Sequence, residues 1–363
     1  MKTDFMNKAM ELAKKGSGFV NPDPLSGAVL VKDNKIIAKG FYKHYGSNSA
    51  EDEILKQIKE PILGSELYLT IEPFRFHSSS DELVNRIKQL GITRVYIGMK
   101  DPNPYKKADF ISDLMAVGVD VVSSDLASAC EELNEIYSYY IQNKKPFVVV
   151  KWAMTLDGKL ATWSGDSKWI SSEGSLEFVH HLRQRVSAIM VGENTVRKDD
   201  PLLTTRLSKG KISNPIRVIL SKYGNLPEDA KVLNVDNQTK TLLITSVNIS
   251  EEKERYFLKK GIDLIKLQER NGHIDFNEIM SALGAFGIDS VYIEGGSSVL
   301  ASAFESGCIH KVYAAVAPKI VGGVTAITPV GGKGIEFMRD AIVLNKVSHE
   351  VIGTDVIIKG YIT

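Results

Sequence analysis

Short apolar runs alternate with helix-like segments along almost the whole chain, and this alternation does most to restrict the fold. The first part of the chain predicts strands at 27–31, 35–40, 67–71, 94–98 and 119–122 and helices at 50–60, 80–90 and 109–117. The first two strands are expected to form a hairpin that turns at Asp33-Asn34. The second part predicts buried strands at 147–152, 188–191, 217–220, 241–244, 263–267 and 290–293. Because helices that alternate with strands pack against a sheet, we expect an α/β fold throughout.

The segment Lys144-Lys145-Pro146 predicts a domain boundary, because it is short, polar and marked by proline. It follows a segment that predicts one long helix at 126–143, and a chain of 363 residues is long enough for two domains. We therefore expect an α/β domain at 1–145 and a larger one at 146–363. The apolar run at 351–358 predicts a late strand of the second domain.

The charge of the chain is almost balanced, which limits the partners to expect. Its 45 basic and 44 acidic residues give a net charge of +1, so we expect no nucleic-acid partner and no anionic membrane. A local basic pocket for one phosphate is compatible with this balance. The chain has two cysteines, Cys130 and Cys308, which favours a reducing, cytoplasmic location. The amphipathic N-terminal segment lacks the apolar core of a secretory signal, and no apolar run is long enough for a transmembrane helix.

The segment Glu294-Gly295-Gly296-Ser297-Ser298 has a mechanism that follows from its residues. It lies between a predicted strand at 291–293 and a predicted helix at 299–305. Glycines let the backbone approach an anion closely, and the start of a helix offers N–H groups and the positive end of a dipole. The turn therefore predicts a phosphate site for a dinucleotide. A plain tight connection is the alternative, since the segment is not the Gly-x-Gly-x-x-Gly fingerprint.

Several further motifs are spread over both parts of the chain. In the first part they are Pro24–Val29, Tyr45–Glu51, Thr70–Pro73 and Asp101–Pro104. In the second part they are Lys151–Lys159, Ser164–Ile170, Val191–Pro201, Leu203–Arg206 and Glu294–Ser298. Together these motifs resemble the bacterial bifunctional riboflavin-biosynthesis deaminase/reductase family, with residues 5–145 similar to the deaminase half and 146–363 to the reductase half. The resemblance implies an N-terminal cytidine-deaminase-like three-layer α/β/α domain and a C-terminal dihydrofolate-reductase-like α/β domain.

The zinc site of the deaminase half is where this chain departs from the family. By register with the family, Ser49 stands in place of the zinc histidine, and Phe74 and Leu83 stand in place of the two zinc cysteines. Serine is a poor zinc ligand, and the other two side chains are not ligands. Glu51 matches the family's proton shuttle but has no metal-bound hydroxide to serve. We therefore expect a degenerate site without zinc or deaminase activity, its vacated pocket filled by Phe74 and Leu83.

Other roles for the degenerate site follow from its chemistry. Ser49, followed three residues later by Asp52, predicts an N-cap for the helix that begins at residue 50. A metal site rebuilt from His44 and His77 is an alternative. If deamination is lost, we expect this domain to brace a dimer or to retain weak nucleotide binding.

The resemblance also implies the ligand contacts of the reductase half. It implies NADPH as cofactor, contacted by Met154, Trp169, Thr195, Asp199, Ser221, Gly296, Ser297, Ser298, Val299 and Leu300. It implies substrate contacts from Ser167, Arg183, Leu203, Arg206 and Glu294. Two arginines suit a phosphate monoester, because guanidinium groups bind phosphate oxygens in a fork. Asp199 is the first candidate for an acid/base role, and Asp157, in a tight turn, is a structural runner-up.

The reaction that the resemblance implies is reduction of a phosphorylated pyrimidine, 5-amino-6-(5-phosphoribosylamino)uracil, to its ribitylamino product. The protein would position the substrate while NADPH supplies the hydride. The family also suggests a homodimer through the reductase domain. One alternative is a reductase for a related pyrimidine or pterin, which departures from the family at Met154, Glu193 and Ser221 keep open. Another is a scaffold that binds NADPH without turnover.

Overall fold

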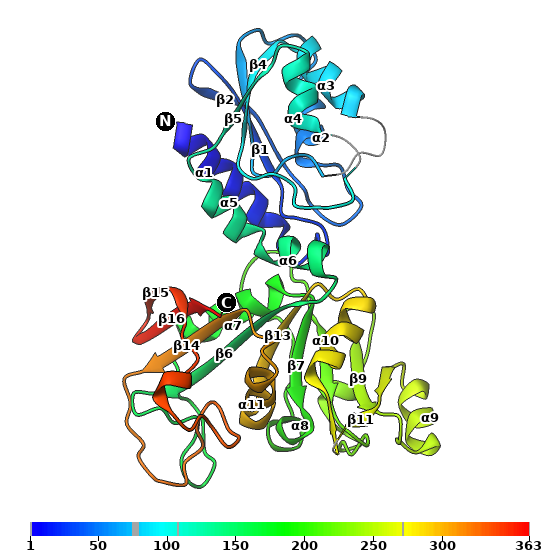
Figure 1. Ribbon diagram of the computed structural model, residues 1–363, viewed down its shortest axis with the longest axis vertical. Coiled ribbons are helices and arrows are strands. Elements are labelled where there is room, and N and C mark those ends of the chain that lie inside the picture. Colours follow the sequence, from blue (N-terminus) through cyan, green and yellow to red (C-terminus); the bar gives the residue numbers. More distant parts are fainter. Residues whose placement is uncertain (1, 75–79, 107–108, 271, 363) are drawn as a thin grey trace. The chain divides into compact units, whose positions relative to one another are not determined.

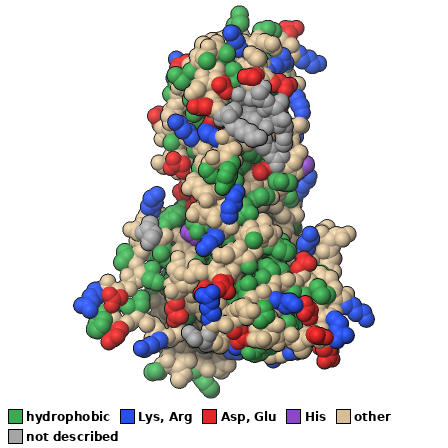
Figure 2. All heavy atoms as spheres, turned by 45° about the vertical axis from the view of Figure 1, so that its right-hand side comes forward, with side chains coloured by type: hydrophobic (Ala, Val, Ile, Leu, Met, Phe, Trp, Pro, Cys, Tyr) green, Lys and Arg blue, Asp and Glu red, His purple; other side chains and the backbone are tan. Residues whose placement is uncertain are grey.

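The computed structural model describes residues 2–74, 80–106, 109–270 and 272–362. The chain divides into two compact units, Met1–Lys144 and Lys145–Thr363, so the division falls within the polar segment before Pro146. Each unit is an α/β structure, as the sequence predicts (Figure 1). On the face drawn in Figure 2, basic and acidic side chains are interspersed rather than gathered by sign. None of the helices in the described ranges is long and apolar enough to cross a membrane.

The first unit is built on a five-stranded sheet in the order β2-β1-β3-β4-β5. The strands are β1 (Gly27–Lys32), β2 (Lys35–Phe41), β3 (Ser65–Leu69), β4 (Ile92–Ile97) and β5 (Asp120–Ser123). β1 pairs antiparallel with both β2 and β3, whereas β3, β4 and β5 run parallel. Asp33 and Asn34 have φ of 49° and 60°, so the predicted hairpin turn is confirmed.

Helices cover both faces of this sheet, because successive strand residues point to opposite sides. They are α1 (Lys2–Ala13), η1 (Lys14–Gly16), α2 (Ala50–Leu55), α3 (Ser80–Gln89), α4 (Phe110–Ala116), α5 (Ala127–Leu133) and α6 (Glu135–Asn143). Leu67 and Leu69 belong to a hydrophobic cluster with side chains of α2, α3 and α4. Tyr68, between them, belongs to a second cluster with side chains of α1, α5 and α6. The predicted three-layer arrangement is therefore confirmed.

The prediction of a single helix at 126–143 is wrong in one respect, because the helix is interrupted at Asn134 and forms α5 and α6. The Asn134 side chain is buried at the break. Its Oδ1 accepts from the Leu25 N–H at 2.8 Å, and its Nδ2 donates to the Leu25 carbonyl at 3.0 Å. These two bonds fix the segment that leads into β1. The helix predicted at 50–60 is also shorter and ends at Leu55.

The second unit is built on a nine-stranded sheet in the order β10-β9-β8-β7-β13-β6-β14-β16-β15. The strands are β6 (Phe147–Thr155), β7 (Ala188–Gly192), β8 (Ile216–Leu220), β9 (Thr241–Ser246), β10 (Asp263–Leu267), β13 (Ser290–Gly295), β14 (Lys311–Ala317), β15 (Asn345–Ile352) and β16 (Asp355–Tyr361). From β10 to β14 the strands run parallel, and β16 and β15 extend the sheet in antiparallel fashion. A separate small hairpin joins β11 (Glu269–Arg270) to β12 (His273–Ile274).

Helices lie on both faces of the second sheet as well. They are α7 (Glu173–Arg185), α8 (Glu193–Asp199), α9 (Glu251–Lys259), α10 (Phe276–Ala285) and α11 (Ser297–Glu305), with the short turns η2 (Lys231–Leu233) and η3 (Met338–Asp340). One hydrophobic cluster joins strand residues to α10 and α11, and another joins the alternate strand residues to α7, α8 and α9. Because both faces are covered, the parallel strands read as continuous apolar runs in the sequence.

The prediction of a single late strand at 351–358 is wrong, because the chain reverses there to form the hairpin of β15 and β16. Gly353 in the turn has φ of 61°, and a β-carbon on it would lie 2.8 Å from Ser172 Oγ. The glycine that interrupts the apolar alternation is therefore the turn itself. β14 lies outside the predicted strands, since its alanine-rich run has little intrinsic strand preference.

Candidate active site

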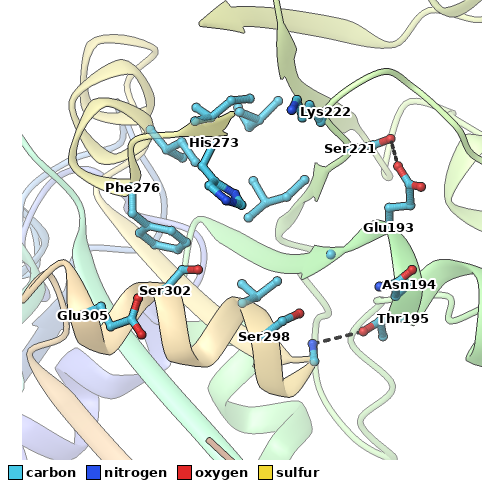
Figure 3. Close-up of a pocket in the computed structure, with 17 residues that line it drawn as sticks. Glu193, Asn194, Thr195, Ser221, Lys222, His273, Phe276, Ser298, Ser302 and Glu305 are labelled. Carbon is cyan, nitrogen blue, oxygen red and sulfur yellow. Dashed lines mark hydrogen bonds between the residues drawn. The ribbon is translucent and has the colours of Figure 1, made fainter. Parts of the chain in front are cut away.

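A cavity of about 670 Å³ lies where the carboxyl ends of β7, β8 and β13 meet. Open parallel sheets bind ligands at this edge. The lining includes five of the residues predicted to contact a cofactor, namely Thr195, Ser221, Gly296, Ser298 and Val299 (Figure 3). Apolar side chains complete the wall, among them Ile244, Ile274, Phe276 and Ile279.

The turn from β13 into α11 forms one side of this cavity. Gly295 has φ of 137°, a conformation that glycine adopts without strain. The Gly296 N–H donates to Thr195 Oγ1 at 3.0 Å, which joins the turn to α8 (Figure 3). No side chain caps α11 at Gly296, so the start of the helix offers backbone N–H groups and a positive dipole end. This geometry suits a diphosphate.

The remaining predicted cofactor residues are not part of this cavity. Met154 is half-buried on β6, and Leu300, a residue of α11, is buried in the hydrophobic core. Ser297 begins α11 but is not among the lining residues. Asp199, the predicted acid/base residue, is exposed at the last position of α8. It lines neither this cavity nor the smaller cavity beside Trp169.

The smaller cavity, of about 120 Å³, is lined by Ser167 and Trp169 together with residues of the preceding loop. Trp169 is 68% exposed, and its carbonyl accepts from Lys319 Nζ at 2.6 Å. The flat face of this tryptophan is thus available to a ligand ring, while its backbone is held in place.

Asp157 holds the neighbouring loops together. Its carboxylate accepts from Thr155 Oγ1 at 2.6 Å and from the N–H groups of Val321 and Gly322 at 3.2 and 2.7 Å. The Thr155 bond, followed by the Gly322 bond, lowers the pKa of Asp157 to about 2. The side chain is therefore ionised at neutral pH and already engaged, which fits the structural role rather than proton donation.

Glu294, Arg183 and Lys151 form a polar cluster near the end of β13, called the buried polar cluster because Arg183 and Lys151 are buried, while 25% of the Glu294 side chain is exposed. Arg183 Nη2 donates to Glu294 Oε1 at 2.5 Å, and its Nη1 donates to the Thr204 carbonyl at 2.9 Å. Lys151 lies on the adjacent parallel strand β6, one position beyond the paired residues. Arg183 Nε and Glu294 Oε2 are buried and have no hydrogen-bond partner among the described residues. Because such atoms are costly to leave unsatisfied, the cluster is a candidate ligand contact.

Lys151 is a candidate site residue outside the set predicted from the sequence. Burial lowers the pKa of its ammonium to about 8, although the charge of Glu294 opposes this shift. A buried amine that titrates this close to neutrality is able to hold or release a proton. In the sequence, Lys151 is distinguished as the one lysine within the otherwise apolar strand predicted at 147–152.

Arg206 differs from Arg183 although both were predicted to contact the substrate. Arg206 is exposed, its Nη1 lies 3.4 Å from Thr204 Oγ1, and its N–H donates to His180 Nδ1 at 3.2 Å. Burial, followed by the charges of Arg183 and Arg206, lowers the pKa of His180 to about 4, so this imidazole is neutral at pH 7. Leu203 is buried with φ of 54°, so its side chain belongs to the core.

Four ionisable residues of the large cavity are absent from the predicted set: Glu193, Lys222, His273 and Glu305. Lys222 directly follows Ser221, a predicted cofactor contact, so its place in the sequence could have indicated that it lies near the cavity. His273 reaches the cavity from the β11–β12 hairpin, about fifty residues later in the chain, and has no local signal.

In the first unit, Ser49 is the N-cap of α2, as predicted. Its Oγ accepts from the Asp52 N–H at 3.1 Å, and its own N–H donates to Asp52 Oδ2 at 3.3 Å. Glu51 is buried, and burial raises its pKa to about 7. The first turn of α2 thus contains a carboxyl group in an environment that disfavours its charge.

Phe74 and Leu83 do not fill one common pocket, so this part of the prediction is wrong. The Phe74 ring packs edge-on against Tyr42, with 5.6 Å between ring centres, and belongs with the cluster of α1, α5 and α6. Leu83 packs with the cluster on the opposite face of the sheet. His77 lies outside the described residues. Within the described part of the chain, no group of three or more His, Cys, Asp or Glu side chains is arranged to hold a metal ion.

A second buried carboxylate in this unit was not predicted. Glu72 accepts from Lys106 Nζ at 2.9 Å and from the Asp101 N–H at 3.1 Å. Tyr137 donates to Asp101 Oδ1 at 2.7 Å. Glu72, Asp101, Lys106 and Tyr137 therefore form a hydrogen-bonded polar network.

Comparison with known proteins agrees with this architecture. Residues 146–358 match the family model described as the RibD C-terminal domain. The chain is 38% identical to the riboflavin biosynthesis protein RibD of Actinobacillus pleuropneumoniae over 98% of this chain and 94% of that protein. The deaminase/reductase of Thermotoga maritima has a similar structure, with a TM-score of 0.83, 31% identity and 100% and 99% of the two chains covered. RibD of Acinetobacter baumannii has a TM-score of 0.85, 26% identity and the same coverage. The chain therefore belongs to the RibD family of riboflavin-biosynthesis proteins, which combine a deaminase domain with a reductase domain.

Proposed function

We propose that the second unit reduces 5-amino-6-(5-phosphoribosylamino)uracil to its ribitylamino product with a hydride from a reduced nicotinamide dinucleotide. The observation that carries this proposal is the end of β13, where Glu294 of the buried polar cluster is two residues from Gly296 of the diphosphate turn. A dinucleotide on the turn and a sugar phosphate at the cluster would therefore meet at one strand end. The T. maritima relative is described by its name as a reductase of this substrate.

The residues around the turn suit the diphosphate of a dinucleotide. The uncapped start of α11 offers N–H donors, and no atom lies within 4 Å of a β-carbon position on Gly295, which leaves room for phosphate oxygens. The resemblance implies NADPH, which would supply the hydride when bound. NADPH and NADH carry the same diphosphate, so the turn itself accommodates both.

The buried polar cluster and the nearby exposed arginine suit the substrate. Arg206, whose guanidinium is exposed, binds the phosphate, and Arg183 holds the Glu294 carboxylate in place. Glu294 Oε2 then accepts from a ribose hydroxyl or an amine of the substrate. Glu294 and Lys151 are better candidates for proton transfer than Asp199, because they lie on adjacent strands next to the turn, whereas Asp199 is exposed at the end of α8.

The test is an anaerobic assay of the purified chain with the deaminated intermediate and either NADPH or NADH. We expect oxidation of the dinucleotide that depends on the intermediate. The Glu294→Gln variant should lose most of the turnover while its fold, followed by circular dichroism, is unchanged. Absence of substrate-dependent oxidation with both dinucleotides would contradict the proposal.

We also propose that the first unit has lost zinc-dependent deamination. The support is that Ser49 serves as a helix cap and Phe74 packs into an aromatic cluster, which leaves neither available as a ligand. Purified protein incubated with zinc should retain less than one equivalent after dialysis and release no ammonia from the aminated precursor. Stoichiometric zinc together with ammonia release would refute this part.

The remaining expectations are a homodimer through the second unit and a cytoplasmic location. The edge strand β15 is exposed and carries apolar side chains, with Val347 57% and Val351 68% exposed, which supports an association surface. Sedimentation equilibrium of the intact chain and of the Val347→Lys variant tests it. The wild type should be dimeric and the variant monomeric.

A further inference from the structure

The proposed reductase function, on which this inference rests, indicates which end of the large cavity would hold the adenosine of the dinucleotide. Glu294 precedes the diphosphate turn by two residues, so the reacting nicotinamide must lie on the Glu294 side of Gly296. The adenosine of the same dinucleotide then extends along the opposite wall. That wall holds Ser221, Lys222 and His273 (Figure 3).

A carboxylate occupies this end of the cavity. Glu193 is the first residue of α8, lines the cavity and is 25% exposed in its side chain. Ser221 Oγ donates to Glu193 Oε2, as the dashed line in Figure 3 marks. The other carboxylate oxygen, Oε1, lies 3.1 Å from Arg197 Nη2, and Arg197 also donates to the Asn225 carbonyl. Glu193 is thus held in a fixed position with its charge at the cavity wall.

The cation at this end is already engaged. Lys222 Nζ lies 2.7 Å from Glu269 Oε2 and donates to the Gly272 carbonyl at 2.6 Å. The other ionisable side chains in the described lining are Glu193, His273 and Glu305. A phosphate monoester carries a charge of about −1.5 to −2 at neutral pH. A 2′-phosphate would therefore face a carboxylate and would have to compete with Glu269 for the ammonium group of Lys222.

A free 2′-hydroxyl would meet the same residues favourably. A carboxylate accepts a hydrogen bond from a ribose hydroxyl, as it does in many sites for dinucleotides without the extra phosphate. We infer that Glu193 makes this cavity select NADH over NADPH. The cofactor of this chain would thereby differ from the one that the family resemblance implies.

Equilibrium titration of the intact chain with each reduced dinucleotide tests this inference. Energy transfer from tryptophan to the reduced nicotinamide reports binding, because Trp152, Trp163 and Trp169 all belong to the second unit. We expect the dissociation constant of NADH to be about tenfold lower than that of NADPH, a difference of about 1.4 kcal/mol. In Glu193→Gln, NADPH should bind about tenfold more tightly and NADH should change less than threefold.

The matched control is Glu305→Gln, which removes a carboxylate from the same cavity at the last position of α11. It should leave the ratio of the two dissociation constants within about twofold of the wild type. Tighter binding of NADPH than NADH by the wild type would overturn the inference and leave the reductase proposal standing. An unchanged ratio in Glu193→Gln would also overturn it. Binding of neither dinucleotide would instead refute the reductase proposal, and this inference with it.

Discussion

Side chains of the same type have different roles in this protein because their surroundings differ. Arg183 is buried and paired with Glu294, whereas Arg206 is exposed beside Thr204. A buried guanidinium whose two Nη groups donate to the Thr204 carbonyl and to Glu294 orients its carboxylate partner. An exposed one remains able to bind an incoming phosphate. At the residue scale, burial therefore separates a positioning arginine from a binding arginine.

Replacement of Arg206 by alanine should weaken substrate binding. A charge-assisted hydrogen bond contributes about 1.5–3 kcal/mol, so KM for the phosphoribosyl substrate should rise about 10- to 100-fold with a smaller change in kcat. Steady-state kinetics measures both parameters. Arg206→Lys, which keeps the charge but not the fork, should give an intermediate KM. An Arg206→Ala enzyme with an unchanged KM would exclude the phosphate contact.

The buried Glu51 should make stability depend on pH. Burial raises its pKa from 4.5 to about 7, so between these values the folded protein binds more protons than the unfolded chain. Its contribution to stability is therefore present below pH 4.5 and is lost as the pH rises to 7. Glu51→Gln should match the wild type at pH 4 and exceed its unfolding free energy by up to about 3 kcal/mol at pH 8.

Urea unfolding at a series of pH values measures this difference. The exposed Glu60→Gln variant is the control, and it should follow the wild type at every pH. If the unfolding free energy of Glu51→Gln varies with pH as that of the wild type does, the pKa of Glu51 is not raised by burial.

At the scale of elements, single side chains decide where helices and strands begin and end. Ser49 begins α2 through a reciprocal pair of hydrogen bonds with Asp52. Asn134 ends α5 because its amide group pairs with the backbone of Leu25 rather than with the helix. Gly353 reverses the chain between β15 and β16. These boundaries depend on hydrogen bonds and left-handed backbone angles more than on hydrophobicity.

Loss of the Asn134 amide group should destabilise the first unit. Asn134→Ala removes two buried hydrogen bonds and leaves the Leu25 N–H and carbonyl without these partners, which should cost about 2–4 kcal/mol. The free energy of unfolding in urea is the measurement. Asn143→Ala, at the exposed end of α6, is the matched control and should cost less than about 0.5 kcal/mol. Equal losses in the two variants would mean that the Asn134 bonds are unimportant.

At the scale of the whole molecule, the two units differ in the chemistry that they hold. The second contains the large cavity, the buried polar cluster and all three tryptophans. The first contains satisfied polar networks around Glu72 and Ser49. A ligand of the second unit should therefore be visible in tryptophan fluorescence without any contribution from the first.

Saturating dinucleotide should stabilise the second unit selectively. At a concentration one hundred times its dissociation constant, a ligand stabilises the folded state by about 2.7 kcal/mol, which corresponds to a rise in Tm of about 5–10 °C. Thermal unfolding followed by tryptophan fluorescence measures this shift. Hydrogen exchange of peptides from 1–144 should be unaffected in the same samples. Equal protection of both units would show that the ligand acts on more than the second unit.

The sequence by itself determined those features that depend on neighbours along the chain. The alternation of apolar runs with helical segments predicted the α/β class, the Ser49–Asp52 spacing predicted the N-cap, and the glycines before α11 predicted a tight turn from strand to helix. Local conformational preference and side-chain periodicity suffice for these, because the interacting groups are only a few residues apart.

Only the tertiary structure decided which distant residues meet. It brought Lys151 beside Glu294, brought His273 into the cavity from a distant hairpin, and left Asp199 on the surface. Burial, and the pKa shifts that follow from it, depend on packing between strands and helices that are far apart in the chain. No local pattern in the sequence encodes that packing, so only the tertiary structure shows which charged side chains are buried and which are exposed.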